Sequence, residues 1–108
     1  MPSITLYTSE NYRLDCESCE KFSTILAGLA QKILNAKQDN IHISYLTAKI
    51  GFGTPIYFEA RLRQEVFRTT ELMEEFMHQV DVLIKEMTGV SARIRCFSFD
   101  ASNIYGKN

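Results

Sequence analysis

Alternating apolar and polar positions predict a strand near the start of the chain. Over residues 3–8, Ile4 and Leu6 alternate with Thr5 and Tyr7. This period-two pattern is typical of a strand that buries one face and exposes the other. We therefore expect a half-buried strand here, with Ile4 and Leu6 on its buried side.

A helical pattern follows this strand. Asp15 is well placed to act as an N-cap, and apolar residues then recur at every third or fourth position. The pattern predicts an amphipathic helix over residues 16–36, with one apolar stripe and one polar face. The stripe consists of Cys19, Phe22, Leu26, Leu29 and Ile33.

The middle of the chain predicts two more strands. Alternation resumes over residues 41–45 and again from residue 56 to about residue 64. Between these segments, Gly51, Gly53 and Pro55 indicate a loop, because glycine and proline interrupt regular structure. The polar side of the second strand is unusually charged, with Tyr57, Glu59, Arg61 and Arg63.

A second helix and a final strand complete the pattern. Thr69 or Thr70 can cap the start of the helix, and Gly89 is suited to its C-terminal end. Residues 92–97 then alternate as a strand. The apolar stripe of the second helix consists of Leu72, Phe76, Val80, Leu83 and Met87.

The order of elements is strand, helix, strand, strand, helix, strand, which makes two strand–helix–strand units at about residues 3–48 and 55–100. A chain of this length can bury roughly two-thirds of its extended surface, so we expect one domain over residues 1–108. Because each helix has a single apolar stripe, both must cover the same face of a four-stranded sheet. The prediction is an α+β fold whose other sheet face meets solvent or another subunit. That face carries His42, Glu59, Arg61, Arg63, Arg93 and Arg95.

Composition and charge exclude several classes of protein. The 12 Lys and Arg residues nearly balance the 13 Asp and Glu residues, so no strong field attracts nucleic acid or an anionic membrane. The apolar runs are too short to span a membrane, and the first residues lack the pattern of a signal peptide. The 3 cysteines form a sparse, odd set that fits a reducing compartment. We expect a cytoplasmic protein with no nucleic-acid or membrane partner.

Pro2 is the first candidate for chemistry. A small second residue usually permits removal of the initiator methionine, and loss of Met1 leaves Pro2 as a free secondary amine at the start of a strand. An α-amino group titrates near pH ~8, and burial or nearby arginines favour its neutral form. A neutral amine is a suitable general base near neutral pH. If Met1 is retained, the same nitrogen is an amide and is not basic.

Cys16 and Cys19 are the second candidate, because a helix N-terminus lowers the pKa of a thiol and favours thiol–disulfide exchange. Thr54 and Pro55 also resemble the segment before the third strand of glutaredoxins. A thioredoxin-type fold, however, needs a helix between its second and third strands. Residues 47–54 are too few and too rich in glycine to form that helix. Thiol redox chemistry therefore stays a minor alternative.

No metal or other cofactor is predicted. Apart from this cysteine pair, the histidines are His42 and His78, which lie on different elements and give no second ligand pair at the spacing of a zinc site. Gly51 and Gly53 lead into a strand and not into a helix, so they do not form a phosphate-binding loop.

Several features, spread over the whole chain, together point to one family. They are the order of elements, the length, the segment Pro2–Leu6, the loop Gly51–Gly53 followed by Pro55, and the ending Phe97–Asn103. Together they resemble the tautomerase superfamily, in particular its macrophage migration inhibitory factor and 5-carboxymethyl-2-hydroxymuconate isomerase branches, or a small bacterial branch. The resemblance implies a homotrimer whose sheets line a central barrel, with active sites at subunit interfaces. It also implies parallel strand–helix–strand units, whereas periodicity alone allows an antiparallel, ferredoxin-like sheet equally well.

The resemblance also implies roles for residues of this chain. Pro2 matches the proline that moves a proton between carbon and oxygen of a 2-oxo acid in these families. Lys37 lies where the inhibitory-factor branch has a pocket lysine, and Arg63 and Gln64 fall where that branch lines its pocket from the end of the third strand. Such cations hold the carboxylate and polarise the oxo group, and a guanidinium can bind a carboxylate through two parallel hydrogen bonds.

Arg95 and Phe97 depart from the pattern of that branch. They match two further pocket positions, which the inhibitory-factor branch fills with tyrosine and asparagine. The exchange makes the pocket more cationic and more apolar. We expect Arg95 to hold an anionic oxygen and Phe97 to pack against the apolar part of a small carboxylate substrate.

The leading hypothesis is therefore a homotrimeric tautomerase that interconverts keto and enol forms of a small 2-oxo or aromatic carboxylate, with Pro2 as general acid–base and no cofactor. The second hypothesis is a non-enzymatic oligomeric interaction protein of the same fold. The state of the N-terminus separates them, because a retained Met1 removes the amine and favours the second hypothesis.

Overall fold

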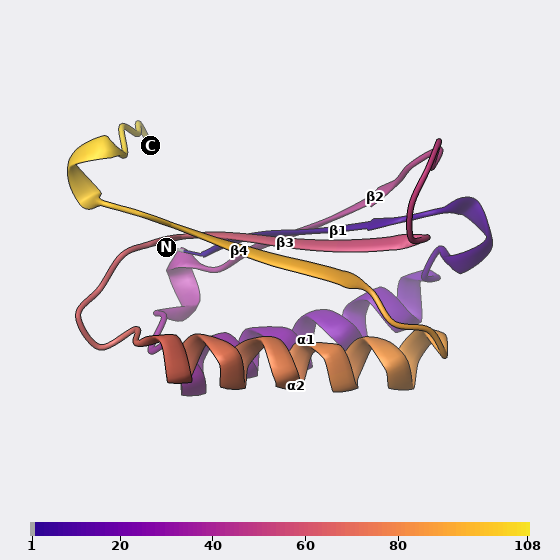
Figure 1. The fold of residues 1–108 in the computed structure, drawn as a ribbon, viewed down its shortest axis with the longest axis horizontal. Helices are drawn as coiled ribbons and strands as arrows, with labels where there is room; N and C mark the ends of the chain where they lie inside the picture. Colours follow the sequence, from indigo (N-terminus) through magenta and orange to yellow (C-terminus); the bar gives the residue numbers. More distant parts are fainter. Residues whose placement is uncertain (1) are drawn as a thin grey trace.

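The computed structural model describes residues 2–108 and contains one four-stranded sheet with two long helices on one of its faces (Figure 1). Within these residues, no helix is both long enough and apolar enough to cross a membrane. The strands and long helices are β1 (Ser3–Thr8), α1 (Cys16–Ile33), β2 (His42–Thr47), β3 (Ile56–Arg63), α2 (Thr70–Thr88) and β4 (Arg93–Phe99). Three short 3-10 helices, η1 (Glu10–Tyr12), η2 (Gln38–Asn40) and η3 (Ala101–Asn103), lie in the connections and after β4.

The strand order is β2-β1-β3-β4. Strand β1 pairs with β2 in parallel, β3 pairs with β4 in parallel, and the two central strands β1 and β3 are antiparallel to each other. Each strand–helix–strand unit is thus a parallel unit, and the two units lie side by side. This arrangement confirms the topology implied by the family resemblance and excludes the ferredoxin-like alternative.

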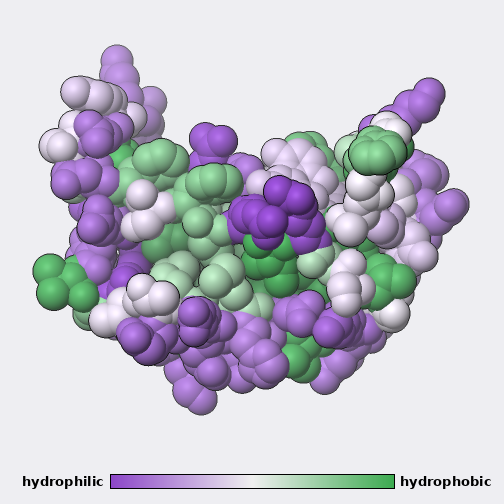
Figure 2. Space-filling view, viewed as in Figure 1, coloured by the Kyte–Doolittle hydropathy of each residue, from purple (hydrophilic) through white to green (hydrophobic). Residues whose placement is uncertain are grey.

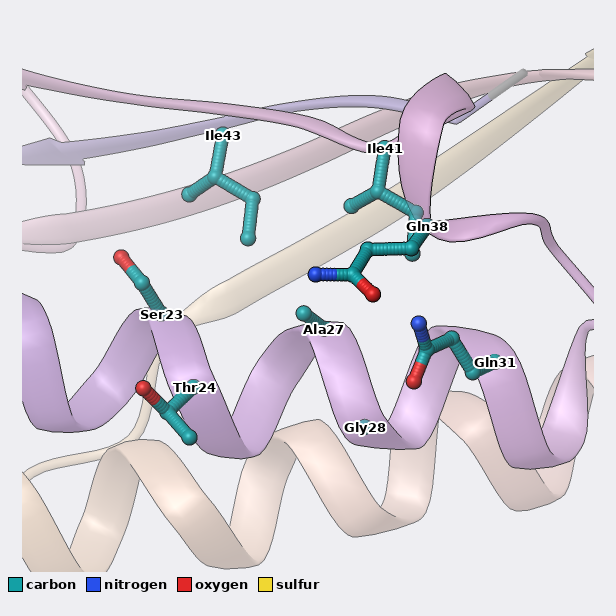
Figure 3. A pocket seen from close by; sticks show the side chains of 8 residues that line it. All are labelled: Ser23, Thr24, Ala27, Gly28, Gln31, Gln38, Ile41 and Ile43. Atoms are coloured by element: carbon teal, nitrogen blue, oxygen red, sulfur yellow. The ribbon is translucent and has the colours of Figure 1, made fainter.

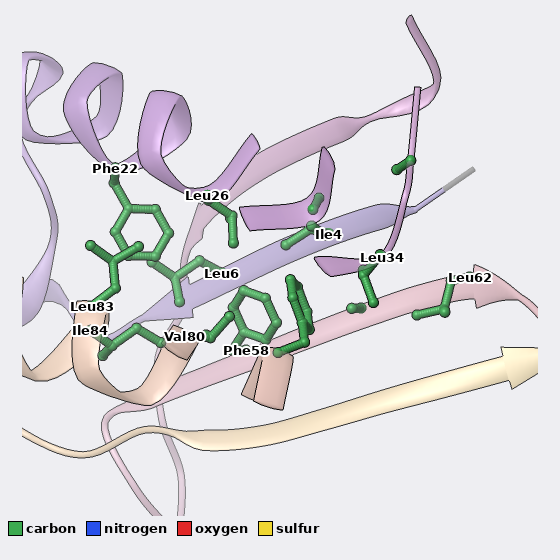
Figure 4. Close-up of a cluster of buried hydrophobic side chains, with 14 of the residues drawn as sticks. Ile4, Leu6, Phe22, Leu26, Leu34, Phe58, Leu62, Val80, Leu83 and Ile84 are labelled. Carbon is green, nitrogen blue, oxygen red and sulfur yellow. The ribbon is translucent and has the colours of Figure 1, made fainter. Parts of the chain in front are cut away.

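The core lies between the helices and one face of the sheet (Figure 4). Strand alternation places Ile4 opposite Ala60 and Leu6 opposite Phe58 on that face, and both helical stripes pack against it. The burial of each large apolar side chain contributes about 1.5–3 kcal/mol to stability, so this layer is the main source of stability. Its fully buried side chains include Phe22, Leu26, Phe58, Phe76, Val80 and Ile84.

The opposite face of the sheet is open, as the alternation predicted. Tyr7 and Tyr57 stack there with ring centroids 5.6 Å apart. Glu59 accepts hydrogen bonds from the Tyr57 hydroxyl at 2.9 Å and from Arg61 Nε at 3.0 Å. Figure 2 shows hydrophilic residues over the outer side of the helical layer and a hydrophobic band above it, with the molecule hollowed between two raised ends.

Three predicted ends are wrong, and one of them is that of β2, which continues to Thr47 and not to residue 45. The first helix ends at Ile33 and not at residue 36, because Asn35 adopts a left-handed conformation with φ 53° and the Ala36 N–H turns back to donate to the Ala30 carbonyl. The last strand continues to Phe99 and not to residue 97, because Phe99 still pairs with Arg63 at the end of β3. These ends depend on backbone pairing that apolar periodicity does not report.

Replacement of Asn35 should show how the end of α1 is stabilised. A Cβ-bearing residue in the left-handed region costs roughly 1–2 kcal/mol, and asparagine pays less of this cost than most residues. We expect Asn35→Ala to lower the free energy of unfolding by about 1 kcal/mol and Asn35→Gly to leave it unchanged or raise it. Urea denaturation measures both. The control Asn11→Gly, at an exposed position without positive φ, should not stabilise the protein, and equal effects of both glycine variants would contradict the explanation.

Candidate functional site

A pocket rich in positive charge lies at the end of the sheet where β1 begins and β3 ends. The link from α1 to β2 and the link from β3 to α2 meet there (Figure 1). The pocket has a volume of about 370 Å³, and three cationic side chains and one carboxylate line it. We call it the basic pocket; its lining residues are Asn35, Ala36, Lys37, Asn40, Arg63, Glu65, Phe67 and Arg68.

Lys37 and Arg63, which are 26 positions apart, are brought together in this pocket. Lys37 is the N-cap residue of η2, and its carbonyl accepts a hydrogen bond from the Asn40 N–H at 2.9 Å. Arg63 is the last residue of β3. Both side chains are exposed. The pocket therefore presents two predicted site residues to solvent from two separate links.

Arg68 is a third cation of the basic pocket, and sequence reasoning missed it. Its Nε donates to the Leu34 carbonyl at 3.1 Å, and its Nη1 donates to the Arg63 carbonyl at 2.7 Å. Its guanidinium carbon lies 5.4 Å from the centroid of the Phe67 ring. Arg68 belongs to a link without apolar periodicity, so its sequence offers no signal beyond an arginine next to a phenylalanine.

Electrostatics distinguish Arg68 from its neighbours. Burial lowers the pKa of the Arg68 guanidinium; nearby Glu65 raises it, and the charge of Arg63 lowers it further. An arginine side chain nonetheless stays protonated at physiological pH. The basic pocket thus contains a charge that is partly withdrawn from water and held by two backbone carbonyls.

Pro2 lies at the same end of the sheet. Its side chain is fully buried, and its carbonyl accepts a hydrogen bond from the His42 N–H at 3.1 Å. Because Ser3 pairs with Arg61 in an antiparallel register, Pro2 lies beside the segment that leads into Arg63. Pro2 does not itself line the basic pocket, and Met1 lies outside the described residues.

Arg95 and Phe97 do not join this pocket within one chain. Both belong to β4 and to the open face of the sheet, and Phe97 is 42% exposed. Arg95 pairs in register with Glu59, which pairs with Thr5. Arg95 is therefore three residues along the strands from Pro2, or about 10 Å, and two strands across.

A second pocket is larger than the basic pocket. It has a volume of about 540 Å³ and lies between α1 and β2, with side chains from both elements directed toward it (Figure 3). Its lining contains no titratable side chain, so it offers neither an acid–base group nor a charge for an anion. We therefore place the candidate site in the basic pocket. The residues of the larger pocket are Ser23, Thr24, Ala27, Gly28, Gln31, Gln38, Ile41 and Ile43.

The two cysteines at the start of α1 lie in different environments. Both are free; Cys16 is exposed, and the Cys19 Sγ donates to the Leu14 carbonyl at 3.7 Å. Burial raises the pKa of the Cys19 thiol, and the charges of Cys16 and Asp15 raise it further. A raised pKa lowers the fraction of thiolate, which is the reactive form. The Cys19 thiol is therefore a weak nucleophile, and the redox alternative stays a prediction.

No protein-family model and no curated protein matches this sequence. Solved structures with the same fold do match. N1, a member of the cis-3-chloroacrylic acid dehalogenase family, aligns with a TM-score of 0.81 at 13% identity over 96% of this chain and 79% of that chain. A macrophage migration inhibitory factor-like protein from Entamoeba histolytica aligns with a TM-score of 0.78 at 10% identity over 99% and 95%.

Pt0534, in a structure inactivated by 2-oxo-3-pentynoate, aligns with a TM-score of 0.73 at 14% identity over 94% of this chain and 89% of that chain. At such low sequence identity, these alignments establish similarity of fold only. This shared fold is the one that the family resemblance of the sequence predicted. The chain has the fold of the tautomerase superfamily, with two helices packed on one face of a four-stranded mixed sheet in the order β2-β1-β3-β4.

Proposed function

We propose that this protein is a tautomerase that interconverts the keto and enol forms of a small 2-oxo or aromatic carboxylate. The observation that carries the proposal is the meeting of Lys37 and Arg63 in one pocket at the end of the sheet that also holds Pro2. A similar fold in Pt0534, which 2-oxo-3-pentynoate inactivates, supports a 2-oxo acid as the ligand class.

The proposed reaction needs one basic nitrogen and a site for developing negative charge. After removal of Met1, the neutral Pro2 amine takes a proton from the carbon next to the oxo group. The C–H electron pair becomes the new carbon–carbon double bond, and the oxo oxygen becomes an enolate. The protonated amine then returns its proton to that oxygen, so the reaction consumes and releases no proton overall.

Both cations of the basic pocket bind the substrate carboxylate in this proposal. The Arg63 guanidinium can bind the carboxylate through two hydrogen bonds. The Lys37 ammonium can add a further charge-assisted hydrogen bond to the same carboxylate. Arg95 from another copy of the chain can stabilise the enolate oxygen as its charge develops. The hydrogen bond from the His42 N–H to the Pro2 carbonyl holds the start of β1 beside β2, and this constrains where the amine lies.

A homotrimer is part of the same proposal. Arg95 and Phe97 lie on the open face, two strands across from β1, and neither lines the basic pocket. In this proposal another copy of the chain supplies them for their expected roles, anion binding for Arg95 and apolar contact for Phe97. Exposed aromatic side chains on β4, with Phe97 at 42% and Phe99 at 40%, support burial of this face against another copy.

A non-enzymatic oligomeric interaction protein is the second candidate. The observation that favours it is the complete burial of the Pro2 side chain, together with its absence from the lining of the basic pocket. The mass of the native protein separates the two candidates. Uniform retention of Met1 would leave Pro2 without an amine and would favour the interaction protein.

Substitution of Pro2 tests the chemistry directly. In a chain shown by mass spectrometry to lack Met1, we expect Pro2→Ala to lower kcat/KM for phenylpyruvate enolisation by about 100-fold or more, because general acid–base groups contribute at least that factor. The matched control is Ser3→Ala, an exposed position on the same strand, which should keep full activity. Undiminished enolisation by Pro2→Ala would exclude Pro2 from the mechanism.

Substitution of the pocket cations tests substrate binding. Lys37→Met and Arg63→Met should each raise KM for phenylpyruvate by about tenfold or more, since each removes a charge-assisted hydrogen bond. Steady-state kinetics at constant ionic strength provide the measurement. Lys49→Met, which removes an exposed lysine that does not line the basic pocket, is the control. Equal KM values in all three variants would remove the basic pocket from the proposal.

A further inference from the structure

Arg68 is placed to hold together the two walls of the basic pocket. The carbonyl that accepts from its Nε belongs to Leu34, the C-cap residue of α1, directly before the segment that carries Lys37. The carbonyl that accepts from its Nη1 belongs to Arg63, the last residue of β3. One side chain therefore joins the end of α1 to the end of β3.

The charge of Arg68 suits this position. The C-terminal end of a helix carries partial negative charge on its unpaired carbonyls, and a cation there is favourable. Within residues 2–108, the ion pairs are Arg13 with Glu10, Arg61 with Glu59, and Lys85 with Asp81, so Arg68 has no carboxylate within 4.0 Å. Its interactions with two backbone carbonyls are thus not replaced by a competing ion pair.

Lys37 and Arg63 need such a fixed frame. Both side chains are exposed, and long exposed side chains lose rotamer freedom when they bind a ligand. The positions that their charged groups can reach depend on where their backbones are anchored. The backbone of Arg63 is anchored by Arg68 on one side and by pairing with Phe99 on the other, whereas η2 positions Lys37 after the end of α1.

We propose that Arg68 is a positioning residue of the basic pocket: through the Leu34 and Arg63 carbonyls, it sets the separation of Lys37 and Arg63 that binds the carboxylate. The inference rests on the proposed function for the identity of the ligand and deepens it. Arg68 acts through Arg63 and not by contact with the substrate. Pro2 is held by a separate hydrogen bond from His42, so the chemical step does not depend on Arg68.

This role makes a specific kinetic prediction. Arg68→Met should raise KM for phenylpyruvate by about tenfold while kcat changes less than about twofold, because only ground-state carboxylate binding is disturbed. Arg68→Lys can reach one carbonyl but not both, so its KM should fall between those of the wild type and Arg68→Met. A merely structural role would lower the melting temperature and leave KM of the folded protein unchanged.

Binding without turnover separates this inference from the proposed function. Phenylacetate has the carboxylate but no oxo group, so its Kd, measured by calorimetry at constant ionic strength, does not depend on catalysis. We expect Arg68→Met to raise this Kd about tenfold, and phenylacetamide, which has no charge, to bind no variant measurably. If the wild type binds phenylacetate but does not enolise phenylpyruvate, the proposed function fails and the role of Arg68 stands.

A double-mutant cycle tests action through Arg63. If Arg68 works by positioning Arg63, Arg68→Met should add less than about twofold to the Kd of an Arg63→Met variant, because coupled sites are not additive. Additive effects would mean direct contact between Arg68 and the ligand and would overturn the inference. An unchanged Kd in the single variant Arg68→Met, or no binding of phenylacetate by the wild type, would overturn it as well.

Two controls account for loss of stability and loss of charge. Ile84→Val removes a methyl group from the fully buried core and lowers stability without changing any charge near the pocket. Arg13→Met removes the exposed arginine that directly follows η1 and pairs with Glu10. Both should bind phenylacetate as the wild type does. If Arg68→Met does not fold, Arg68→Lys is carried through the same measurements, and an unchanged KM and Kd in that variant would refute the inference.

Discussion

Burial of one sheet face beneath two helices is the constraint on which the rest of this structure depends. Side chains of β1 and β3 alternate strictly between the two faces, so the residues that pack on the helices also decide which residues are left exposed. Phe22, Phe58 and Phe76 lie at the centre of that contact and are fully buried. The charged open face and the exposed links at the ends of the sheet are consequences of this single-sided packing.

The candidate site lies outside the packed core, in the links between elements. Links between elements carry functional residues more often than the elements themselves, since a rigid scaffold positions them while they remain accessible. Here α1 ends early at Asn35 and turns toward η2, while β3 ends at Arg63 and the chain turns toward α2. The basic pocket forms because these two turns occur at the same end of the sheet as the start of β1. Arg68 ties the two turns together through their backbone carbonyls.

Much of the fold could be predicted because its main signals are local. Asp15 and Thr69 cap the two helices as expected, each accepting a backbone hydrogen bond from three residues ahead, and Gly89 ends α2 in the left-handed conformation that glycine favours. The ends of α1 and β4 were misjudged because long-range pairing and a left-handed asparagine decide them. Lys37 and Arg63, which line the candidate site, were named only through the family resemblance, and that resemblance did not point to Arg68.

The sequence by itself determined the number and order of the strands and long helices, because caps and apolar periods act over a few residues. It also determined which side chains of β1, β3 and β4 share a face. Only the tertiary structure decided the parallel pairing within each unit, the separation of Arg95 from Pro2, and the joining of Lys37, Arg63 and Arg68 in one pocket. These relations link residues far apart in the chain, and they arise from how two units pack and register against each other, which no local pattern encodes.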